Sequence, residues 1–546
     1  MKNNLVSTAI KETFSAEDNN IILGDWCHPY IDEKSKFKLK KIQFHWESPD
    51  KKKRDYEYLQ KLYYKILKNL TASLNTYHSI QKEERYWHII VGPFLLNFLQ
   101  ILWDRWENVR VAFKEEKINE TRIIDTESNE LICSDFKDTF DGKKNDHLWN
   151  HMIYSEILNF LKFKNLNIIK IKKIFKNEKV VFYKSYIEKK SLIKLCFKLN
   201  QLPRKYNELS KKINFITLPN REKFKVNINP ANEFENFFEK TLLKIMPYSY
   251  LENYKKIRDE TKKIKLTPKV IFTAAGQTSD DFFKIWAAEK VLKGSKYIVS
   301  DHGGYMDDKQ NFDAWSNFSD CYLRWNLVNK KNIKQMPLGI LFKKYKNLDT
   351  VKSNKILLLS STSNIYPNKI QSPPMTGQII DDVKLWENFY IKLDKEKKES
   401  FKIRVHITDP WNIKNYFLKK YGKRILSNKK DFKEDIESSK IIINTNFSTP
   451  FFETIHSARP TIVLSQQSHF SLSNEKIELL KELLENKILF KDIQSAINHL
   501  NNIYDNPFQW WNSDKILKIK EKFHNLCFVK KKNDLDYWKN FFLSYL

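Results

Sequence analysis

The stretch IIINTNFSTPFFETIHSARPTIV, residues 441–463, decides the fold of this chain. It begins with an apolar triplet, 441–443, that is typical of a short buried strand, and a polar turn follows. The run 450–457 predicts a helix that opens on the hydroxyl groups of that turn, with proline where a first helical turn tolerates it. A second apolar strand is predicted at 461–464. We therefore expect a β-turn-α-β unit of a parallel sheet.

The start of this helix has the chemistry of an anion site. Free backbone N–H groups, together with the hydroxyls of Ser448 and Thr449, suit a phosphate group. Glu453 follows within the first helical turn, where a carboxylate can reach the diol of a ribose. These three residues are our candidate donor site for a nucleotide-activated sugar. The same residues are also compatible with a plain helix cap, since serine and threonine are common at that position.

The same alternation of strands and helices extends through the second half of the chain. Apolar strands are predicted at residues 270–273, 297–300, 321–325, 355–360 and 403–407, with helices at 280–292, 383–393 and 432–439. The polar segment 345–354 interrupts this pattern and predicts a domain boundary. The sequence indicates two Rossmann-like domains facing a cleft, and in such sheets ligands bind beyond the carboxyl ends of the strands.

The first part of the chain is less regular. A short strand is predicted at 21–23, helices at 55–70, 85–106, 149–163 and 233–246, edge strands within 170–190, and a loop-rich insert at 108–146. Gly92-Pro93 is expected to kink or start the second helix. The domain prediction is an acceptor-side α/β domain over 1–345, a nucleotide-sugar-binding domain over 355–510 and a helical tail over 511–546.

Composition and charge limit the class of protein. The chain has 546 residues, 41% hydrophobic and 14% aromatic, so it can build a sizeable core. Its formal net charge of +30 favours anionic partners such as nucleic acid, acidic lipid or phosphorylated substrates. A lysine-rich composition with only 10 glycines is also typical of an AT-rich genome, which raises the charge without any partner.

The spacing of the cysteines and the length of the apolar segments indicate the cellular compartment of the protein. The five cysteines form no CxxC pair and no cluster with histidine, which argues against a disulfide framework or a zinc site: Cys27, Cys133, Cys196, Cys321 and Cys527. Reduced thiols are typical of the cytosol. We expect neither a signal peptide nor an apolar run of 18 residues, so any membrane contact would be peripheral. The prediction is a cytoplasmic protein, with the inner face of the plasma membrane as a second location.

Three residues of the first domain are candidates for catalysis. His302 follows a predicted strand and precedes two glycines, and a histidine there can take a proton from an attacking hydroxyl. Asp301 can orient that imidazole or contact substrate. Asp25 follows the strand at 21–23 and is a second candidate base. His28 and Arg105 are weaker candidates, and Arg105 is expected to pair with an acid or to stack on a neighbouring tryptophan.

The second domain offers further polar residues. Ser361 and Thr362 follow the first strand of its sheet, where a diphosphate would bind. Arg404 lies in a predicted strand with His406 two residues on, so both would face one side, and Arg404 is a candidate phosphate contact. Within each of the adjacent acidic pairs, 307–308 and 381–382, the two side chains would point to opposite faces of a strand. We therefore predict no metal site and no cofactor other than the donor substrate.

Several blocks, in order, resemble a family of transferases from bacterial surface-carbohydrate loci, first catalogued in Leptospira. They are STAIKETF (7–14), IILGDWC (21–27), RYWHIIVGPFLLNFLQILWDRW (85–106), LWNHMIYSEIL (148–158), DHGG (301–304), STPFFETIHSARPTIV (448–463) and DNPFQWW (505–511). The resemblance covers nearly the whole chain. It implies a GT-B-like glycosyltransferase with extra N-terminal helices and a C-terminal helical tail.

The resemblance also implies roles for two residues. The His-Gly turn is similar to that of capsule and teichoic-acid polymerases, which implies acceptor activation by His302, and the glutamate of the C-terminal motif corresponds to Glu453. The family usually has a turn of the form QHGGGYG, whereas this chain reads DHGGYMDD, with Asp301 in place of glutamine. The altered turn therefore leaves two questions open: which donor or acceptor the protein uses, and whether it retains activity.

The leading hypothesis is an inverting, metal-independent glycosyltransferase that uses a nucleotide sugar and a surface-polysaccharide or lipid-linked glycan acceptor. Peripheral contact with an anionic membrane would give the basic surface a purpose. One alternative is a basic nucleic-acid-binding protein, although no nucleic-acid motif is evident and we predict no such partner. The other is a non-catalytic scaffold of GT-B shape.

Overall fold

The computed structural model describes residues 2–29, 35–126, 128–172, 221–309, 311–337, 353–370, 374–457, 459–467, 469, 471–527 and 534–546. Cys196, most of the expected boundary at 345–354 and most of the expected edge strands at 170–190 lie outside these residues. The described strands form three sheets, and every strand pair within them is parallel.

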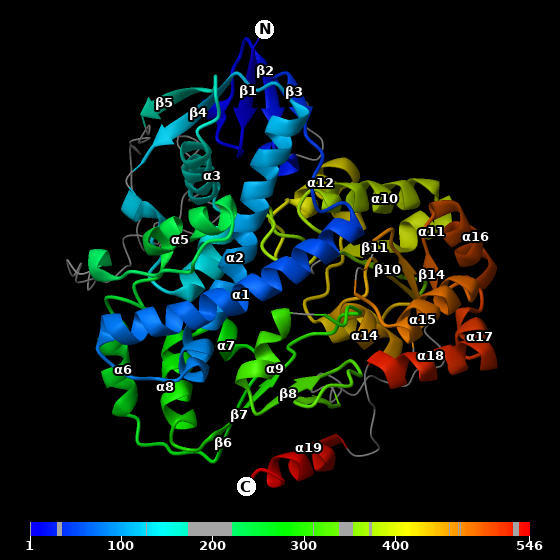
Figure 1. The fold of residues 1–546 in the computed structure, drawn as a ribbon. Coiled ribbons are helices and arrows are strands. Elements are labelled where there is room, and N and C mark those ends of the chain that lie inside the picture. The colour runs from blue at the N-terminus through cyan, green and yellow to red at the C-terminus, as the bar shows by residue number, and fades with distance from the viewer. Residues whose placement is uncertain are drawn as a thin grey trace, which may run out of the picture.

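The first sheet has the strand order β3-β2-β1-β4-β5 and lies at the top of Figure 1. Its strands are β1 (Asn3–Val6), β2 (Asn19–Ile22), β3 (Leu39–Lys41), β4 (Glu120–Asp125) and β5 (Asn167–Lys172). This is the Rossmann strand order 3-2-1-4-5, in which the chain first builds to one side of β1 and then returns to the other.

The second sheet lies at the opposite end of the molecule and has the order β6-β7-β8-β9 (Figure 1). Its strands are β6 (Val270–Thr273), β7 (Lys296–Ser300), β8 (Cys321–Arg324) and β9 (Ile333–Gln335). The C-terminal helix α19 (Asp534–Leu543) returns to this sheet, where Phe541 joins a small core with Ile298 and Leu323.

The third sheet has the order β11-β10-β12-β13-β14. Its strands are β10 (Ile356–Leu359), β11 (Phe401–Arg404), β12 (Ile441–Asn444), β13 (Thr461–Leu464) and β14 (Leu489–Phe490). The strands β10, β12 and β13 are buried along their whole length, which explains why they are continuous apolar runs. The strand order reverses between β10 and β12, the kind of position at which open α/β sheets bind ligands.

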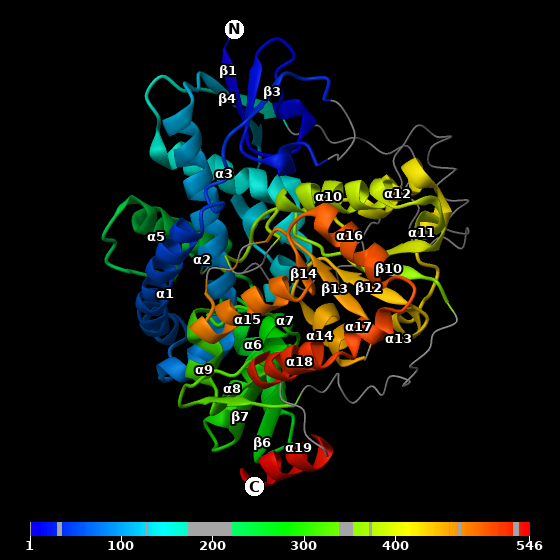
Figure 2. The same ribbon diagram turned by 90° about the vertical axis from the view of Figure 1, so that its right-hand side faces the viewer.

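Helices cover both faces of the third sheet, as Figure 2 shows. Ile356 and Ile443 point into the large core on the side of α10 and α16, whereas Leu357 and Ile442 pack against Ile436 of α13. The helices of this lobe are α10 (Gln378–Lys392), α11 (Lys395–Ser400), α12 (Ile413–Tyr421), α13 (Phe432–Glu437), α14 (Thr449–His456), α15 (Asn474–Glu485), α16 (Ile493–Ile503), α17 (Pro507–Trp511) and α18 (Asp514–Cys527).

Two long helices run between the first and second sheets (Figure 1). They are α1 (Pro49–His78) and α2 (Glu84–Glu115), and Ser48 caps the first of them by accepting a hydrogen bond from the backbone N–H of Lys51. The other described helices of this half are α3 (His147–Leu161), α5 (Glu233–Ile245), α6 (Tyr254–Lys262), α7 (Gly276–Ser279), α8 (Asp281–Val291) and α9 (Ala314–Phe318).

Helix α2 is the central element of the core. Its length and composition would allow it to cross a membrane, with a mean hydropathy of 1.3 in its most apolar window, but 94% of that window is buried inside the protein. Pro93 lies within the helix and does not start it. One continuous apolar cluster joins α2 to all three sheets, including Leu5 of β1, Ile271 of β6 and Ile356 of β10. The sheets are therefore held together by a shared core.

The α/β prediction with parallel, Rossmann-like sheets is confirmed. The β-turn-α-β unit forms as β12, α14 and β13, and β6 coincides with its predicted range. Two predictions needed correction. Residues 108–146 are not a loop-rich insert, since they contain the end of α2 and strand β4. Strand β11 ends at Arg404, so His406 lies beyond it.

Candidate functional site

The His-Gly turn after β7 touches the start of α14 directly. The backbone N–H of Gly304 donates to Thr449 Oγ1 at 3.1 Å, and Tyr305 forms an isolated antiparallel bridge with Ser448. A Cβ atom placed on Gly303 would lie 2.6 Å from Thr449 Oγ1. The glycines are therefore required for close approach between two turns that come from different sheets.

We predict that Gly303→Ala lowers the free energy of unfolding by about 1–3 kcal/mol, because the added methyl group overpacks this contact. Chemical denaturation of the purified variant measures the loss. The double variant with Thr449→Ala removes the opposing hydroxyl, so it should lose less stability than the sum of the two single variants. If the two losses of unfolding free energy simply add, the two turns are not in tight contact.

A cavity of about 470 Å³ opens around this contact. Its walls come from the carboxyl ends of strands in the second and third sheets, where α/β proteins bind ligands. The lining residues that the sequence singled out are Asp301, His302, Ser361, Thr362, His406, Ser448 and Thr449. The structure therefore brings together predicted residues of both lobes.

The side chain of His302 is exposed to this cavity. The walls of the cavity still displace much of the water around the imidazole, and this desolvation is the main reason that its pKa is lowered. The nearby Lys369 ammonium lowers the pKa as well, while Asp301 acts in the opposite direction. The imidazole is therefore mostly neutral near pH 7, which is the form that can accept a proton.

Asp301 points away from solvent into a buried network. Its carboxylate accepts a hydrogen bond from Tyr305 at 2.5 Å and another from Tyr322, and it pairs with Arg324 at 3.5 Å. Through its contacts with the two tyrosines and the guanidinium, the carboxylate holds in place the turn that carries His302. A catalytic role for Asp301 stays a prediction.

Asp25 does not lie with His302. It begins a short 3₁₀ turn, Asp25–Cys27, and forms an ion pair with Lys41 at 3.0 Å. A Cβ on Gly377, just before α10, would lie 2.0 Å from its carboxylate, so Asp25 packs against the third-sheet lobe. It is absent from the lining of the 470 Å³ cavity. Its role as a base stays a prediction that this placement does not favour.

Glu453 lines a neighbouring cavity of about 520 Å³. The side chain is buried, and Ser360, His406, Thr449 and Pro450 line both this cavity and the one that contains His302. The two cavities therefore meet at the start of α14. A single elongated ligand could occupy both.

Arg404 lines the same 520 Å³ cavity, but its guanidinium is already engaged. It bonds to the Asp435 carboxylate at 2.8 Å and to the carbonyl of Lys429 at 2.9 Å. The Thr362 hydroxyl similarly donates to the carbonyl of Thr408 at 3.0 Å, and the Ser361 backbone N–H donates to Thr445 Oγ1 at 2.8 Å. These contacts shape the loop after β10, and the phosphate-binding roles stay predictions.

Sequence reasoning missed two polar pairs at the cavity. His469 Nδ1 lies 2.8 Å from the Asp307 carboxylate, and both residues line the cavity. Gln467 donates to Asp382 at 2.9 Å, and burial raises the pKa of that carboxyl to about 7. The position of Gln467 and His469 just beyond β13 was an available signal, because polar residues at the carboxyl end of a parallel strand face a ligand site.

Metal ligands are not grouped in the described part of the chain. No cluster of three or more histidine, cysteine, aspartate or glutamate side chains suited to a metal ion occurs among those residues. The described cysteines Cys27, Cys133, Cys321 and Cys527 are buried and free.

Comparisons with known proteins place the chain in a family. The model of the LIC12162 family transferases matches residues 3–173 and 160–542. No curated protein matches the chain significantly. Among solved structures, the S. aureus MnaA-UDP co-structure is similar at 9% sequence identity and a TM-score of 0.33, over 79% of this chain and 98% of that one. The family match spans almost all of the sequence, and both turns of the cavity lie within it: this chain belongs to the LIC12162 family transferases.

Proposed function

We propose that this protein is a GT-B-type glycosyltransferase that moves a sugar from a nucleotide-activated donor to a surface-polysaccharide or lipid-linked glycan acceptor. One observation carries the proposal: the His302 turn and the start of α14 meet around a cavity at the carboxyl ends of two parallel sheets. Membership in a transferase family supports the same reading. The sugar and the base of the nucleotide are left open.

In this proposal the donor lies across the two connected cavities. Its phosphates contact the start of α14 at Ser448 and Thr449, where backbone N–H groups and the helix dipole favour negative charge. Glu453 bonds to the ribose in the 520 Å³ cavity. The base would rest on the rim near Ile407, an apolar side chain that is 96% exposed. The sugar then points toward His302.

Transfer follows as a single displacement. The acceptor hydroxyl oxygen attacks the anomeric carbon while His302 takes the hydroxyl proton. The bond from the anomeric carbon to the phosphate oxygen breaks, and the nucleoside phosphate leaves with the bonding electrons. The start of α14 stabilises the charge that develops on the leaving group without requiring a metal ion. Attack opposite the leaving group inverts the anomeric configuration.

The proposal is tested by donor binding and turnover. Melting curves of the purified protein with UDP, GDP, CMP and dTDP should reveal one preferred nucleotide, since a ligand at 100 times its Kd stabilises a protein by about 2.7 kcal/mol. The matching nucleotide sugar should then release its nucleotide when acceptor is present. Nucleotide binding without turnover would favour the scaffold alternative, and tight RNA binding without nucleotide binding would favour the nucleic-acid alternative.

We predict that Glu453→Gln weakens binding of the preferred nucleotide about tenfold, because a charge-assisted hydrogen bond to the ribose is replaced by a neutral one. Isothermal titration measures the change. A 2′,3′-dideoxy nucleotide provides the control: it should bind the wild type weakly, and the variant should discriminate less than the wild type does between it and the natural nucleotide. Equal discrimination against the dideoxy nucleotide by both proteins would place the ribose elsewhere.

We propose further that the protein acts in the cytoplasm, in peripheral contact with the inner face of the plasma membrane. The formal net charge of +30 suits an anionic lipid surface or an anionic acceptor. Co-sedimentation with vesicles that contain anionic lipid, compared with neutral vesicles, tests this part. The expected binding to anionic vesicles should weaken as salt increases.

A further inference from the structure

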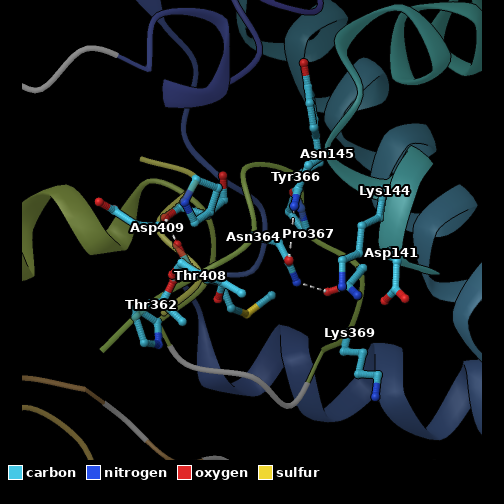
Figure 3. A pocket seen from close by; sticks show the side chains of 16 residues that line it. Asp141, Lys144, Asn145, Thr362, Asn364, Tyr366, Pro367, Lys369, Thr408 and Asp409 are labelled. Atoms are coloured by element: carbon cyan, nitrogen blue, oxygen red, sulfur yellow. Dashed lines mark hydrogen bonds between the residues drawn. The ribbon is translucent and has the colours of Figure 1, made fainter. Parts of the chain in front are cut away.

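A third cavity has a volume of about 620 Å³, and Figure 3 shows the side chains that line it. One wall is the loop that follows β10, and the opposite wall is the segment around residues 141–145 that precedes α3. Thr362 and Lys369 line both this cavity and the one that contains His302, so the two are contiguous. The proposed donor does not use this space.

Two lysines lie at one end of the cavity (Figure 3). The ammonium groups of Lys144 and Lys369 lie 4.0 Å and 5.7 Å from the centre of the same Phe140 ring. Within the part of the chain that the structure describes, the Phe140 ring is the contact of both ammonium groups, and neither forms an ion pair or a hydrogen bond with another residue. Asp141 is the acidic side chain that also lines this end of the cavity, and it is exposed.

Among the described residues, the two ammonium groups contact an aromatic ring but no carboxylate pairs with either of them. Burial and, to a smaller extent, the charge of Lys144 together lower the pKa of Lys369 to about 8. Burial also lowers the pKa of Lys144, against the opposing effect of Asp141. Two like charges with little solvent are unfavourable unless a counter-charge arrives. A bound anion would supply that counter-charge.

Hydrogen bonds hold the loop that lines the cavity in place. Arg105, which is fully buried, donates to the carbonyl of Pro367 at 2.6 Å, and the backbone N–H of Ile370 donates to Gln100 at 3.0 Å, so the loop is fixed to α2. Asn364 donates to Asn368 at 2.8 Å within the lining. A ligand would therefore meet a cavity whose shape is already formed, which reduces the cost of ordering on binding.

We infer that this cavity holds the phosphate or diphosphate group of the acceptor, with Lys144 and Lys369 as its cations. The inference rests on the proposed transferase function. Lys369 lies on the boundary with the His302 cavity, so an acceptor anchored here by its phosphate extends its hydroxyl toward that histidine. The donor phosphates are expected at the start of α14, on the other side of the shared boundary. The acceptor is then either lipid-linked or a soluble phosphorylated glycan.

Titration with inorganic pyrophosphate tests the anion site by itself. Lys144→Met and Lys369→Met should each weaken its binding at least tenfold, because each removes one of two cations while keeping the length of the side chain. Lys384→Met is the matched control, since Lys384 is an exposed lysine of α10 outside this cavity, and it should bind as the wild type does. Melting temperatures confirm that each variant is folded. Unchanged pyrophosphate binding in both cavity variants overturns the inference.

Competition separates this inference from the proposed function. Saturating nucleotide should leave pyrophosphate binding in place and should stabilise the lysine variants as it does the wild type. Displacement of pyrophosphate by nucleotide would assign the lysines to the donor and overturn the acceptor assignment. If pyrophosphate binds in a lysine-dependent way but no nucleotide binds, the proposed transferase function is refuted and the proposed anion site is supported. Farnesyl diphosphate distinguishes a lipid-linked acceptor from a soluble one. If it binds more tightly than pyrophosphate, and this binding depends on the lysines, the acceptor is lipid-linked. If the two bind equally well, the acceptor is soluble.

Discussion

Replacing His302 with alanine is expected to lower kcat/KM for sugar transfer by about 10²- to 10⁴-fold, the usual contribution of a positioned general base. The side chain is exposed to the cavity, so its loss should leave the melting temperature and the nucleotide affinity near those of the wild type. Nucleotide release in the presence of acceptor measures the rate. This variant tests the chemical step apart from donor binding.

The pH profile gives a second readout of the same residue. Only the neutral imidazole accepts a proton, and the pKa of His302 lies below the ordinary histidine value of about 6.5 because of burial and the Lys369 charge. The wild-type kcat/KM should therefore rise with pH through an inflection below about 6.5 and level off near pH 7, and the alanine variant should lack this inflection. If His302→Ala keeps the rate and His469→Ala loses it, the base is His469, held by Asp307.

Asp301→Ala is expected to lower the free energy of unfolding by about 3–5 kcal/mol, the usual cost of removing one partner of a buried ion pair. The Arg324 guanidinium, itself almost fully buried, would lose its carboxylate partner, and the hydroxyls of Tyr305 and Tyr322 would lose their acceptor. Chemical denaturation measures the change. The loss arises because a buried charge and two donors are left without compensation.

Asp301→Asn distinguishes a structural role from a catalytic one. The amide keeps one oxygen acceptor and the shape of the side chain, so it should lose less stability than alanine does, and nucleotide binding should survive. An asparagine variant with unchanged stability and a rate reduced about 10²-fold or more would assign Asp301 to the chemistry and contradict the structural interpretation.

Local patterns predicted the elements around the site well. The unit at 441–463 was predicted correctly because its apolar runs, its proline and its turn hydroxyls all act within a few residues. The sequence prediction placed strand β11 too far toward the C-terminus, because the end of this strand is set by its pairing with a neighbouring strand. It pairs with β10 up to Leu359, opposite Arg404, and the apolar residues beyond that point have no partner strand. Strand β4 was missed because its burial depends on β1 and β5, which lie far away in sequence.

The sequence by itself determined the chemistry available at the strand ends: a histidine before two glycines, and hydroxyls with a carboxylate at a helix start. Only the tertiary structure decided which strand ends meet. Gly304 contacts Thr449 across 145 positions, and Asp307 contacts His469 across 162. It also placed Asp25 outside the cavity, turned Asp301 into the core and brought Lys369 to the boundary between the His302 cavity and its neighbour. Strand and helix signals are local, whereas contacts between lobes depend on how distant apolar faces pack into one core.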